Sequence, residues 1–186
     1  MAIMTNETPT RPFNDHSDPP DAASSTRLET DITLAARCSA PVLITAPIDD
    51  AQAIVQAIAA QNHQDPQGRP GSAPEILTFD PAAGGDVLAT IAASGRNGAA
   101  RHRAILWLKD VDALKSAEQA AVMDLLAVGS GIPGRTLRVI ASSSVDLLDR
   151  VESGGFDVRL FYRLNTIHIV AQPSGSADRD VAQGWP

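Results

Sequence analysis

Residues 135–170, RTLRVIASSSVDLLDRVESGGFDVRLFYRLNTIHIV, contain the pattern that decides the fold. Two almost uninterrupted apolar runs of strand length, Thr136–Ala141 and Thr166–Val170, enclose a more polar segment. Continuous apolar runs are typical of strands buried on both faces, as in parallel sheets that are covered by helices. The stretch therefore predicts two strands of such a sheet.

Three further apolar runs of strand length precede this stretch, and helical patterns lie between the runs. The runs are Pro41–Thr45, Glu75–Phe79 and Ala104–Lys109, and the helical patterns are Asp49–Ala60, Asp86–Ala93 and Ser116–Val128. The last helix begins with Ser116 and Gln119 at the spacing of a capping box. Alternating strands and helices predict a doubly wound α/β domain with about five mostly parallel strands.

The two ends of the chain differ in composition from its middle. Residues 1–28 and 172–186 are rich in Pro, Asp, Ser and other polar residues, which predicts disordered tails. Residues 29–171 then form one α/β domain. Trp185, in the second tail, is either part of an unstructured end or a small docking contact.

The composition argues against several classes of function. The formal net charge is −7, and because an acidic surface repels nucleic acid, no autonomous DNA binding is expected. No stretch approaches the roughly 18 apolar residues of a transmembrane helix, and the first residues do not resemble a signal peptide. With Cys38 as the only cysteine and no histidine pair at metal-ligand spacing, we expect no disulfide and no metal site. These features predict a cytoplasmic protein.

Three segments, in order and on a matching strand–helix pattern, resemble the AAA+ ATPase domain of sigma-54-dependent transcription activators. The segments are Ala40–Pro47, then Ala104–Leu114 with Ala117–Gln119 and Leu125–Leu126, and finally Leu137–Asn165, which is the most specific. They resemble the strand before the phosphate loop, the Walker B strand with its following helix, and the sensor I strand with the arginine-finger segment. The resemblance implies a three-layer P-loop NTPase-like core with strand order 5-1-4-3-2. The helical lid is expected to be absent, because 16 residues follow Val170, and the loop that contacts sigma-54 is missing.

The phosphate loop implied by this resemblance is degenerate. It corresponds to Ala46, Pro47, Ile48, Asp49, Asp50, Ala51 and Gln52. A phosphate loop needs glycines, whose backbone N–H groups converge on the phosphates, and a lysine that neutralises their charge. Here no glycine is present, and Gln52 stands at the lysine position. Asp49 and Asp50 are predicted to occupy the anion site, with Asp49 and Gln52 as a capping pair, and each carboxylate would repel a triphosphate by on the order of 4 kcal/mol at ~4 Å.

The Walker B position carries the opposite charge to that of the family. Where the family has Asp followed by Glu, this sequence has Lys109 followed by Asp110. A lysine repels Mg²⁺, and Asp110 is shorter than the glutamate that activates water. We expect Lys109 to form a salt bridge with Asp49 or Asp50, which would replace the missing pairing of metal and phosphate.

Sensor I and the arginine-finger segment are also changed. Ser144 stands at the position of the sensor I asparagine and reaches less far. Asp157 replaces the first arginine of the finger segment, whereas Arg163 is retained at the second arginine position. Arg163 either reaches the site of a neighbouring subunit or forms a surface ion pair.

Together these residues predict a non-catalytic AAA+ domain that acts as a regulatory or protein-interaction module in transcription. No cofactor is expected, and the partner would be an AAA+ subunit or a component of RNA polymerase. The alternative is a domain that retains ATP binding or weak ATPase activity and acts with sigma-54 RNA polymerase; only then are ATP and Mg²⁺ expected. A third possibility is a relic with no cellular role.

Overall fold

The computed structural model describes residues 20–62, 73–87, 89, 102–128 and 135–171. The described strands are β1 (Val42–Thr45), β2 (Glu75–Phe79), β3 (His102–Leu108), β4 (Arg135–Ser143) and β5 (Ile167–Val170). The α-helices are α1 (Pro20–Arg37), α2 (Ile48–Gln61), α4 (Ser116–Val128), α5 (Leu147–Glu152) and α6 (Val158–Leu164), and two 3-10 turns are η1 (Pro81–Ala83) and η3 (Val111–Ala113).

All neighbouring strands in the sheet are parallel, in the order β2-β3-β4-β1-β5. Read from the other edge, this is the order 5-1-4-3-2, so the predicted topology is confirmed. The register pairs Thr45 with Ser143 on one side and with Val170 on the other. The carboxyl ends of β1, β4 and β5 therefore lie side by side at one edge of the sheet, which we call the carboxyl edge.

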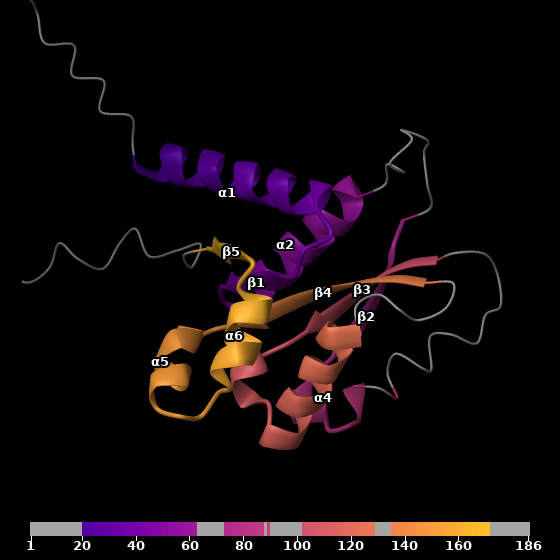
Figure 1. The fold of residues 1–186 in the computed structure, drawn as a ribbon. Coiled ribbons are helices and arrows are strands. Elements are labelled where there is room, and N and C mark those ends of the chain that lie inside the picture. The colour runs from indigo at the N-terminus through magenta and orange to yellow at the C-terminus, as the bar shows by residue number, and fades with distance from the viewer. Residues whose placement is uncertain (1–19, 63–72, 88, 90–101, 129–134, 172–186) are drawn as a thin grey trace, which may run out of the picture.

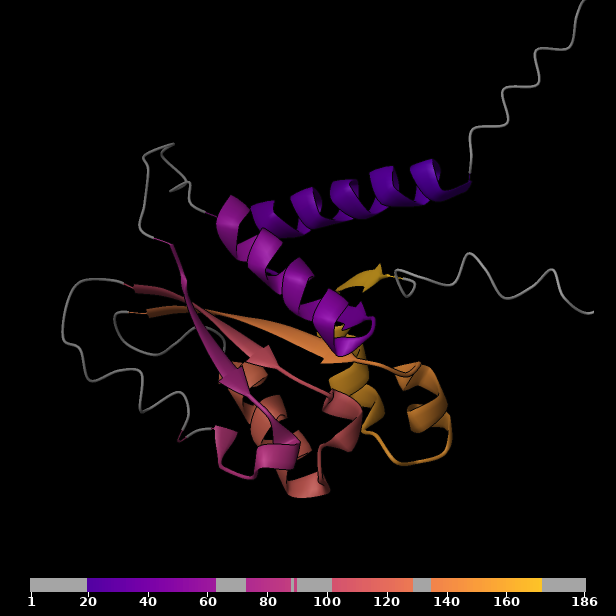
Figure 2. The same cartoon turned by 180° about the vertical axis from the view of Figure 1, so that it is seen from behind.

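Helices cover both faces of the sheet and form three layers (Figures 1 and 2). On one face, α1 and α2 pack over a core that includes Ile32, Ile58 and Trp107. On the other face, a second core joins β3 and β4 to α4, α5 and α6, with Leu106 and Leu160 fully buried within it. Because successive side chains of a strand point to opposite faces, strands in the middle of this arrangement are apolar throughout, as in the fully buried run from Val42 to Ile44.

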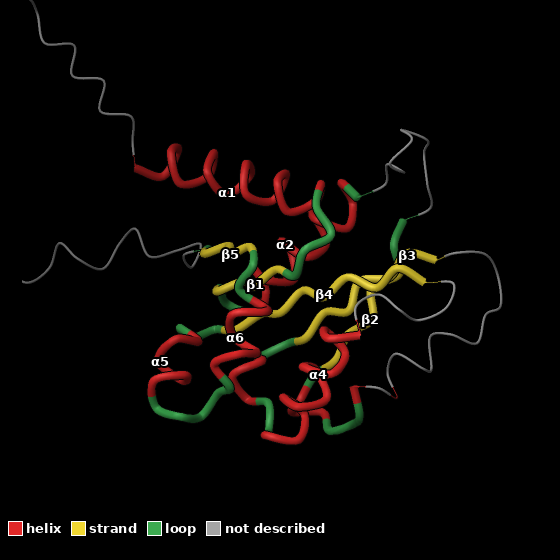
Figure 3. Tube along the Cα trace, in the orientation of Figure 1, coloured by secondary structure: helices red, strands yellow, loops and turns green. Residues whose placement is uncertain are grey.

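The N-terminal boundary of the domain corrects the sequence analysis. A helix, α1, occupies Pro20–Arg37 (Figure 3), whereas residues up to 28 were expected to be a disordered tail. Its second half packs on the sheet, with Ile32, Ala35 and Ala36 buried. The other residues predicted to form tails, 1–19 and 172–186, lie outside the described part of the chain.

A buried arginine connects α1 to the sheet. Arg138 in β4 is 5% exposed, and its Nη2 donates to the carbonyl of Ala35 at 2.6 Å. Burial lowers the pKa of Arg138, and the nearby Arg103 lowers it further. The carbonyls at the carboxyl end of α1 carry partial negative charge, which favours a cation at this position.

The start of α4 also differs from its prediction. Glu118 accepts a hydrogen bond from the backbone N–H of Lys115 at 2.7 Å, so the reciprocal half of a capping box is made by Glu118. Gln119, the residue expected in this role, is buried and makes other contacts. The bounds Ser116–Val128 are as predicted, whereas the helix expected over Asp86–Ala93 falls largely outside the described residues.

Two short helices between β4 and β5 were not predicted. Both begin at an aspartate whose side chain accepts a hydrogen bond from the first turn: Asp146 for α5 and Asp157 for α6. Neither helix exceeds two turns, so the helical period is too short to read from sequence. None of the described helices is long and apolar enough to cross a membrane.

Candidate functional site

The residues predicted to form a site follow three neighbouring strands at the carboxyl edge. Ala46–Gln52 follows β1, Lys109 and Asp110 follow β3, and Ser144 follows β4. Since parallel strands of an α/β sheet bind ligands outside their carboxyl ends, the fold brings the predicted positions to one edge. Their contacts decide what chemistry they can carry out.

The connection between β1 and α2 is too short for a phosphate loop. β1 ends at Thr45 and α2 begins at Ile48, so that only Ala46 and Pro47 connect them. Ala46 is buried, and its N–H donates to the carbonyl of Ser143 at 3.0 Å. A P-loop spans several residues, so that its backbone N–H groups surround the phosphates. Two residues, one of them a proline without an N–H, cannot form such a cradle.

The expected capping pair at this helix is wrong. Pro47 is the N-cap of α2, and no side chain caps it, because Asp49 and Gln52 are already inside the helix. Asp49 and Asp50 do lie in the first turn, where the helix dipole favours negative charge. The end of α2 that would face an anionic ligand therefore carries two carboxylates, while Gln52 is exposed.

Lys109 makes a different contact from the predicted salt bridge. Its ammonium lies over the ring of Trp107, with Nζ 4.9 Å from the ring centroid, which is the geometry of a cation–π interaction. The Trp107 indole N–H in turn donates to the Ser142 hydroxyl at 3.0 Å. The cation at the Walker B position is thus held by an aromatic residue two positions earlier in β3.

Asp110 adopts an unusual backbone conformation. It has φ 40° and ψ 54°, the left-handed region that is uncommon for residues other than glycine. Burial raises the pKa of its carboxyl, and the nearby Asp112 and Asp80 raise it further, while Lys109 opposes the shift. Within the described residues no cluster of three or more acidic, His or Cys side chains is arranged to hold a metal ion.

The polar contacts after β4 centre on Ser143. Its hydroxyl lies 2.9 Å from Asp112 Oδ1 and accepts a hydrogen bond from the N–H of Val145. Arg150 Nη2 donates to the carbonyl of Asp112 at 3.2 Å. Ser144, the predicted sensor I residue, is exposed. Asp112 and Ser143 were missed because their contact joins η3 to the end of β4, 31 residues apart in sequence.

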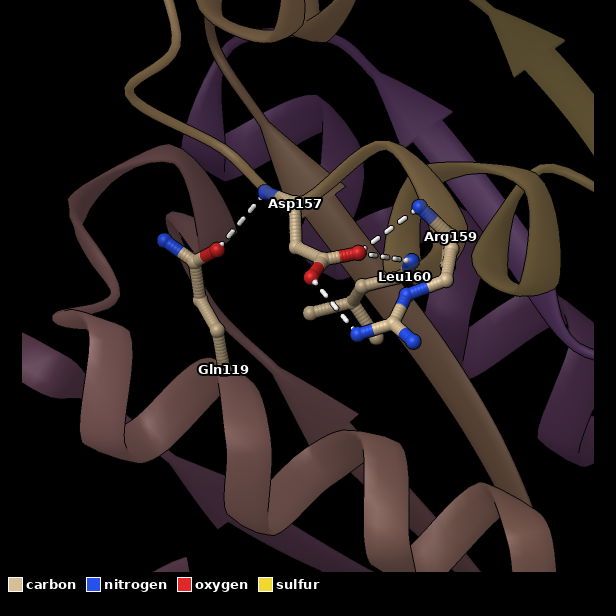
Figure 4. Close-up of polar contacts among 4 residues, drawn as sticks. All are labelled: Gln119, Asp157, Arg159 and Leu160. Carbon is tan, nitrogen blue, oxygen red and sulfur yellow. Dashed lines mark hydrogen bonds and ion pairs between the residues drawn. The ribbon is translucent and has the colours of Figure 1, made fainter.

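Asp157 is a structural residue in the arginine-finger segment (Figure 4). Its carboxylate accepts hydrogen bonds from the N–H groups of Arg159 at 2.7 Å and Leu160 at 3.1 Å, and it pairs with the Arg159 guanidinium at 3.4 Å. The backbone hydrogen bonds from Leu160 and Arg159 hold the pKa of this carboxyl below its usual range. Asp157, which the sequence analysis placed at the first arginine position of the finger segment, is therefore the N-terminal cap of α6.

Gln119 connects this segment to α4. Its amide oxygen accepts from the N–H of Asp157 at 2.8 Å, and its amide nitrogen donates to the carbonyls of Leu114 and Gly155 at 2.9 and 3.2 Å. A hollow of about 390 Å³ lies beside these contacts, between the first half of α4 and residues 154–159. It borders the arginine-finger segment and does not include Ala46–Gln52.

Arg163 lies in the last turn of α6 and is exposed. It forms no ion pair with the residues that the structure describes, so the surface ion pair, one of its two predicted roles, is not seen there. Val158 and Tyr162, one helical turn apart on the same helix, are 48% and 69% exposed. The outer side of α6 thus presents apolar side chains beside a cation.

The comparison with known families confirms the resemblance that the sequence suggested. Residues 21–172 match the family model described as the sigma-54 interaction domain. The chain belongs to this family. The match begins at the first turn of α1, so the helix missing from the sequence analysis is part of the sigma-54 interaction domain. No protein of curated function matches the chain in sequence.

Solved structures of P-loop NTPases share the fold of this domain. NtrX from Brucella abortus in complex with ATP matches with a TM-score of 0.58 and 21% identity, over 79% of this chain and 36% of NtrX. The P-loop NTPase domain of a sigma-54 transport activator from E. coli matches with a TM-score of 0.55 and 11% identity, over 82% of this chain and 97% of that domain. A point mutant of RuvB from Thermotoga maritima matches with a TM-score of 0.54 and 12% identity, over 79% of this chain and 45% of RuvB.

These similarities show the fold. The chain spans about a third of the length of NtrX, so the activity of a whole activator does not transfer from the comparison. Three local features of this sigma-54 interaction domain bear on nucleotide binding: a two-residue connection after β1, a lysine after β3 and an aspartate before α6.

Proposed function

We propose that this sigma-54 interaction domain neither binds nor hydrolyses ATP and acts in transcription regulation by binding another protein. The observation that carries the proposal is the connection of β1 to α2 by Ala46 and Pro47 alone. Without a loop of free N–H groups, the most important contacts to a triphosphate are missing.

The charges at the carboxyl edge support this proposal. Asp49 and Asp50 lie in the first turn of α2, where a P-loop NTPase binds phosphate. Lys109 follows β3 and contacts Trp107, where an acidic residue would be needed to hold a divalent cation. Each substitution disfavours one component of a nucleotide–Mg²⁺ complex. No cofactor is therefore proposed.

Differential scanning fluorimetry with ATP, with and without Mg²⁺, tests the loss of nucleotide binding. We expect no change in Tm up to millimolar ATP, because a ligand stabilises a protein only if it binds the folded state. An ATP-binding relative such as NtrX serves as the positive control. A saturable rise in Tm would contradict the proposal.

The proposed partner is an AAA+ subunit or a component of sigma-54 RNA polymerase. The name of the family supports such a partner, and the exposed side of α6, with Tyr162 and Arg163, offers apolar and cationic contacts. In pull-downs with purified partners, we expect Tyr162→Ala and Arg163→Ala to reduce capture, whereas Glu152→Gln, on α5, should not. Capture that is unchanged in both α6 variants would remove this side of α6 from the proposal.

The second candidate function is weak ATP hydrolysis in concert with sigma-54 RNA polymerase. It is favoured by family membership over residues 21–172 and by the exposed Arg163. Steady-state phosphate release, measured with the domain alone and with an active AAA+ subunit, tests it. If the domain alone releases phosphate and Asp110→Asn abolishes this release, the result would support this candidate.

A further inference from the structure

Exposed apolar side chains gather at the carboxyl edge of the sheet. The described residues include eight large hydrophobic side chains that are exposed, and four of them follow or end the strands β1, β4 and β5. These four are Ile48, Val145, Leu148 and Val170, with exposed fractions of 37%, 44%, 42% and 59%. Because Thr45 pairs with both Ser143 and Val170, the three strand ends are adjacent. We call these four residues the carboxyl-edge surface.

Carboxylates flank this apolar surface on two sides. Asp49 and Asp50 follow Ile48 in the first turn of α2, and Asp146 and Asp149 lie on either side of Leu148 at the start of α5. Asp49, Asp146 and Asp149 are exposed. The carboxyl-edge surface thus combines exposed apolar side chains with carboxylates that lie next to them in the chain.

Two cations among the described residues near this edge have contacts of their own. Lys109 lies over the Trp107 ring, and Arg150 donates to the carbonyl of Asp112. Asp49, Asp146 and Asp149 form no ion pair with the residues that the structure describes. An occupant of the surface has to bring positive charge with it.

We propose that the carboxyl-edge surface binds a cationic, partly apolar segment of a partner protein. Lys or Arg side chains of such a segment would pair with Asp49 and Asp149, while their aliphatic stems and neighbouring apolar residues cover Val145 and Val170. A second copy of this chain fits less well, because it brings a net charge of −7 of its own. The inference rests on the proposed function, since it takes the interaction role as given and names the chemistry of the partner.

Fluorescence anisotropy with a labelled peptide of alternating Lys and Leu residues tests the proposal on the full chain. Two double variants probe the surface: Asp49→Asn with Asp149→Asn for its charge, and Val145→Ser with Val170→Ser for its apolar side chains. Asp146 is left intact because it caps α5. The matched control is Glu29→Gln with Asp124→Asn, two exposed carboxylates on α1 and α4. The Tm of each variant is measured to confirm folding.

We expect both surface variants to raise the Kd for the peptide by about fivefold to tenfold, because two contacts are lost in each, while the control variant leaves it unchanged. Added salt should weaken binding to the unaltered chain. Equal weakening by surface and control variants would overturn the proposal, since binding would then follow total charge. Spermine has charge but no large apolar side chain, so displacement of the labelled peptide by spermine at the same concentration as by unlabelled peptide would also overturn the proposal. Failure of the peptide to bind the unaltered chain would overturn it too.

The outcome is separable from that of the proposed function. A saturable rise in Tm with ATP would contradict the non-catalytic role, whatever the peptide does. If ATP does not change the Tm and the surface variants bind the peptide as tightly as the unaltered chain does, only the assignment of this surface would be overturned.

Discussion

Lys109 shows how a cation is held at the carboxyl edge. Its ammonium is half-buried over Trp107, and a cation–π contact at an accessible position contributes about 0.5–1 kcal/mol. We therefore expect Lys109→Ala to lower the free energy of unfolding by about that amount, measured by urea denaturation, with Lys109→Arg largely preserving it because guanidinium groups also lie over aromatic rings. A loss of about 3 kcal/mol or more would instead indicate a buried ion pair.

Asp157 makes the stability of the domain depend on pH. Its pKa is lowered in the folded state from an ordinary value of 3.8, mainly by hydrogen bonds from the N–H groups of Leu160 and Arg159. The folded state therefore favours the ionised carboxyl, and this contribution is fully present above pH 3.8 and is lost as the pH falls through the lowered pKa. The advantage of the natural chain over Asp157→Ala should be constant near pH 7 and shrink in acid.

The pH experiment has a direct control. Asp157→Asn keeps a side-chain acceptor at the N-cap but does not titrate, so its stability relative to Asp157→Ala should not change with pH at this site. Urea denaturation at several pH values between neutrality and about pH 3 measures both differences. If Asp157 stabilises the domain relative to alanine equally in acid and at neutral pH, its ionisation is not the source of the pH dependence, which would contradict the prediction.

Gln119 joins α4 to the segment that leads into α6. It is 7% exposed and makes three hydrogen bonds, to the N–H of Asp157 and to the carbonyls of Leu114 and Gly155. Since each buried hydrogen bond contributes about 1 kcal/mol, and its loss leaves the partner unsatisfied, Gln119→Ala should lower the free energy of unfolding by about 2–3 kcal/mol.

A neighbouring residue of α4 provides the comparison for Gln119. Ser116 is exposed at the start of the helix, and the half of the capping box found there is made by Glu118 with the N–H of Lys115. Ser116→Ala is therefore expected to change stability by less than about 0.5 kcal/mol. Equal effects of the Ser116 and Gln119 substitutions in urea denaturation would argue for the capping box that the sequence suggested.

At the scale of the whole molecule, α1 completes one of the two cores. Ile32 is buried against α2 and the sheet, whereas Leu34 on the same helix is 59% exposed. Truncating a buried isoleucine removes transfer energy and leaves a cavity, so Ile32→Ala should cost about 2–4 kcal/mol. Leu34→Ala, which removes similar atoms from the surface, should cost less than about 0.5 kcal/mol. A small effect at Ile32 in urea denaturation would place α1 outside the cooperative domain.

The sequence by itself determined the sheet, because strands that are buried on both faces appear in the sequence as continuous apolar runs. Each of the five apolar runs became a strand, with bounds that shifted by one or two residues at most ends and not at all in β2, Glu75–Phe79. The absence of glycine and lysine from Ala46–Gln52 was also visible in the sequence. The start of α1 was missed because its first half has too few apolar residues to show a helical period.

Only the tertiary structure decided what the changed residues contact. Lys109 contacts Trp107 rather than an aspartate, and Ser143 rather than Ser144 bonds the loop after β3. Gln119 binds a backbone N–H that is 38 residues away. Crossover connections bring such partners together, and hydrogen bonds depend on distances of a few tenths of an ångström. Hydrophobic periodicity records which face is buried, whereas the partner of a polar side chain is fixed by how the strands and helices pack.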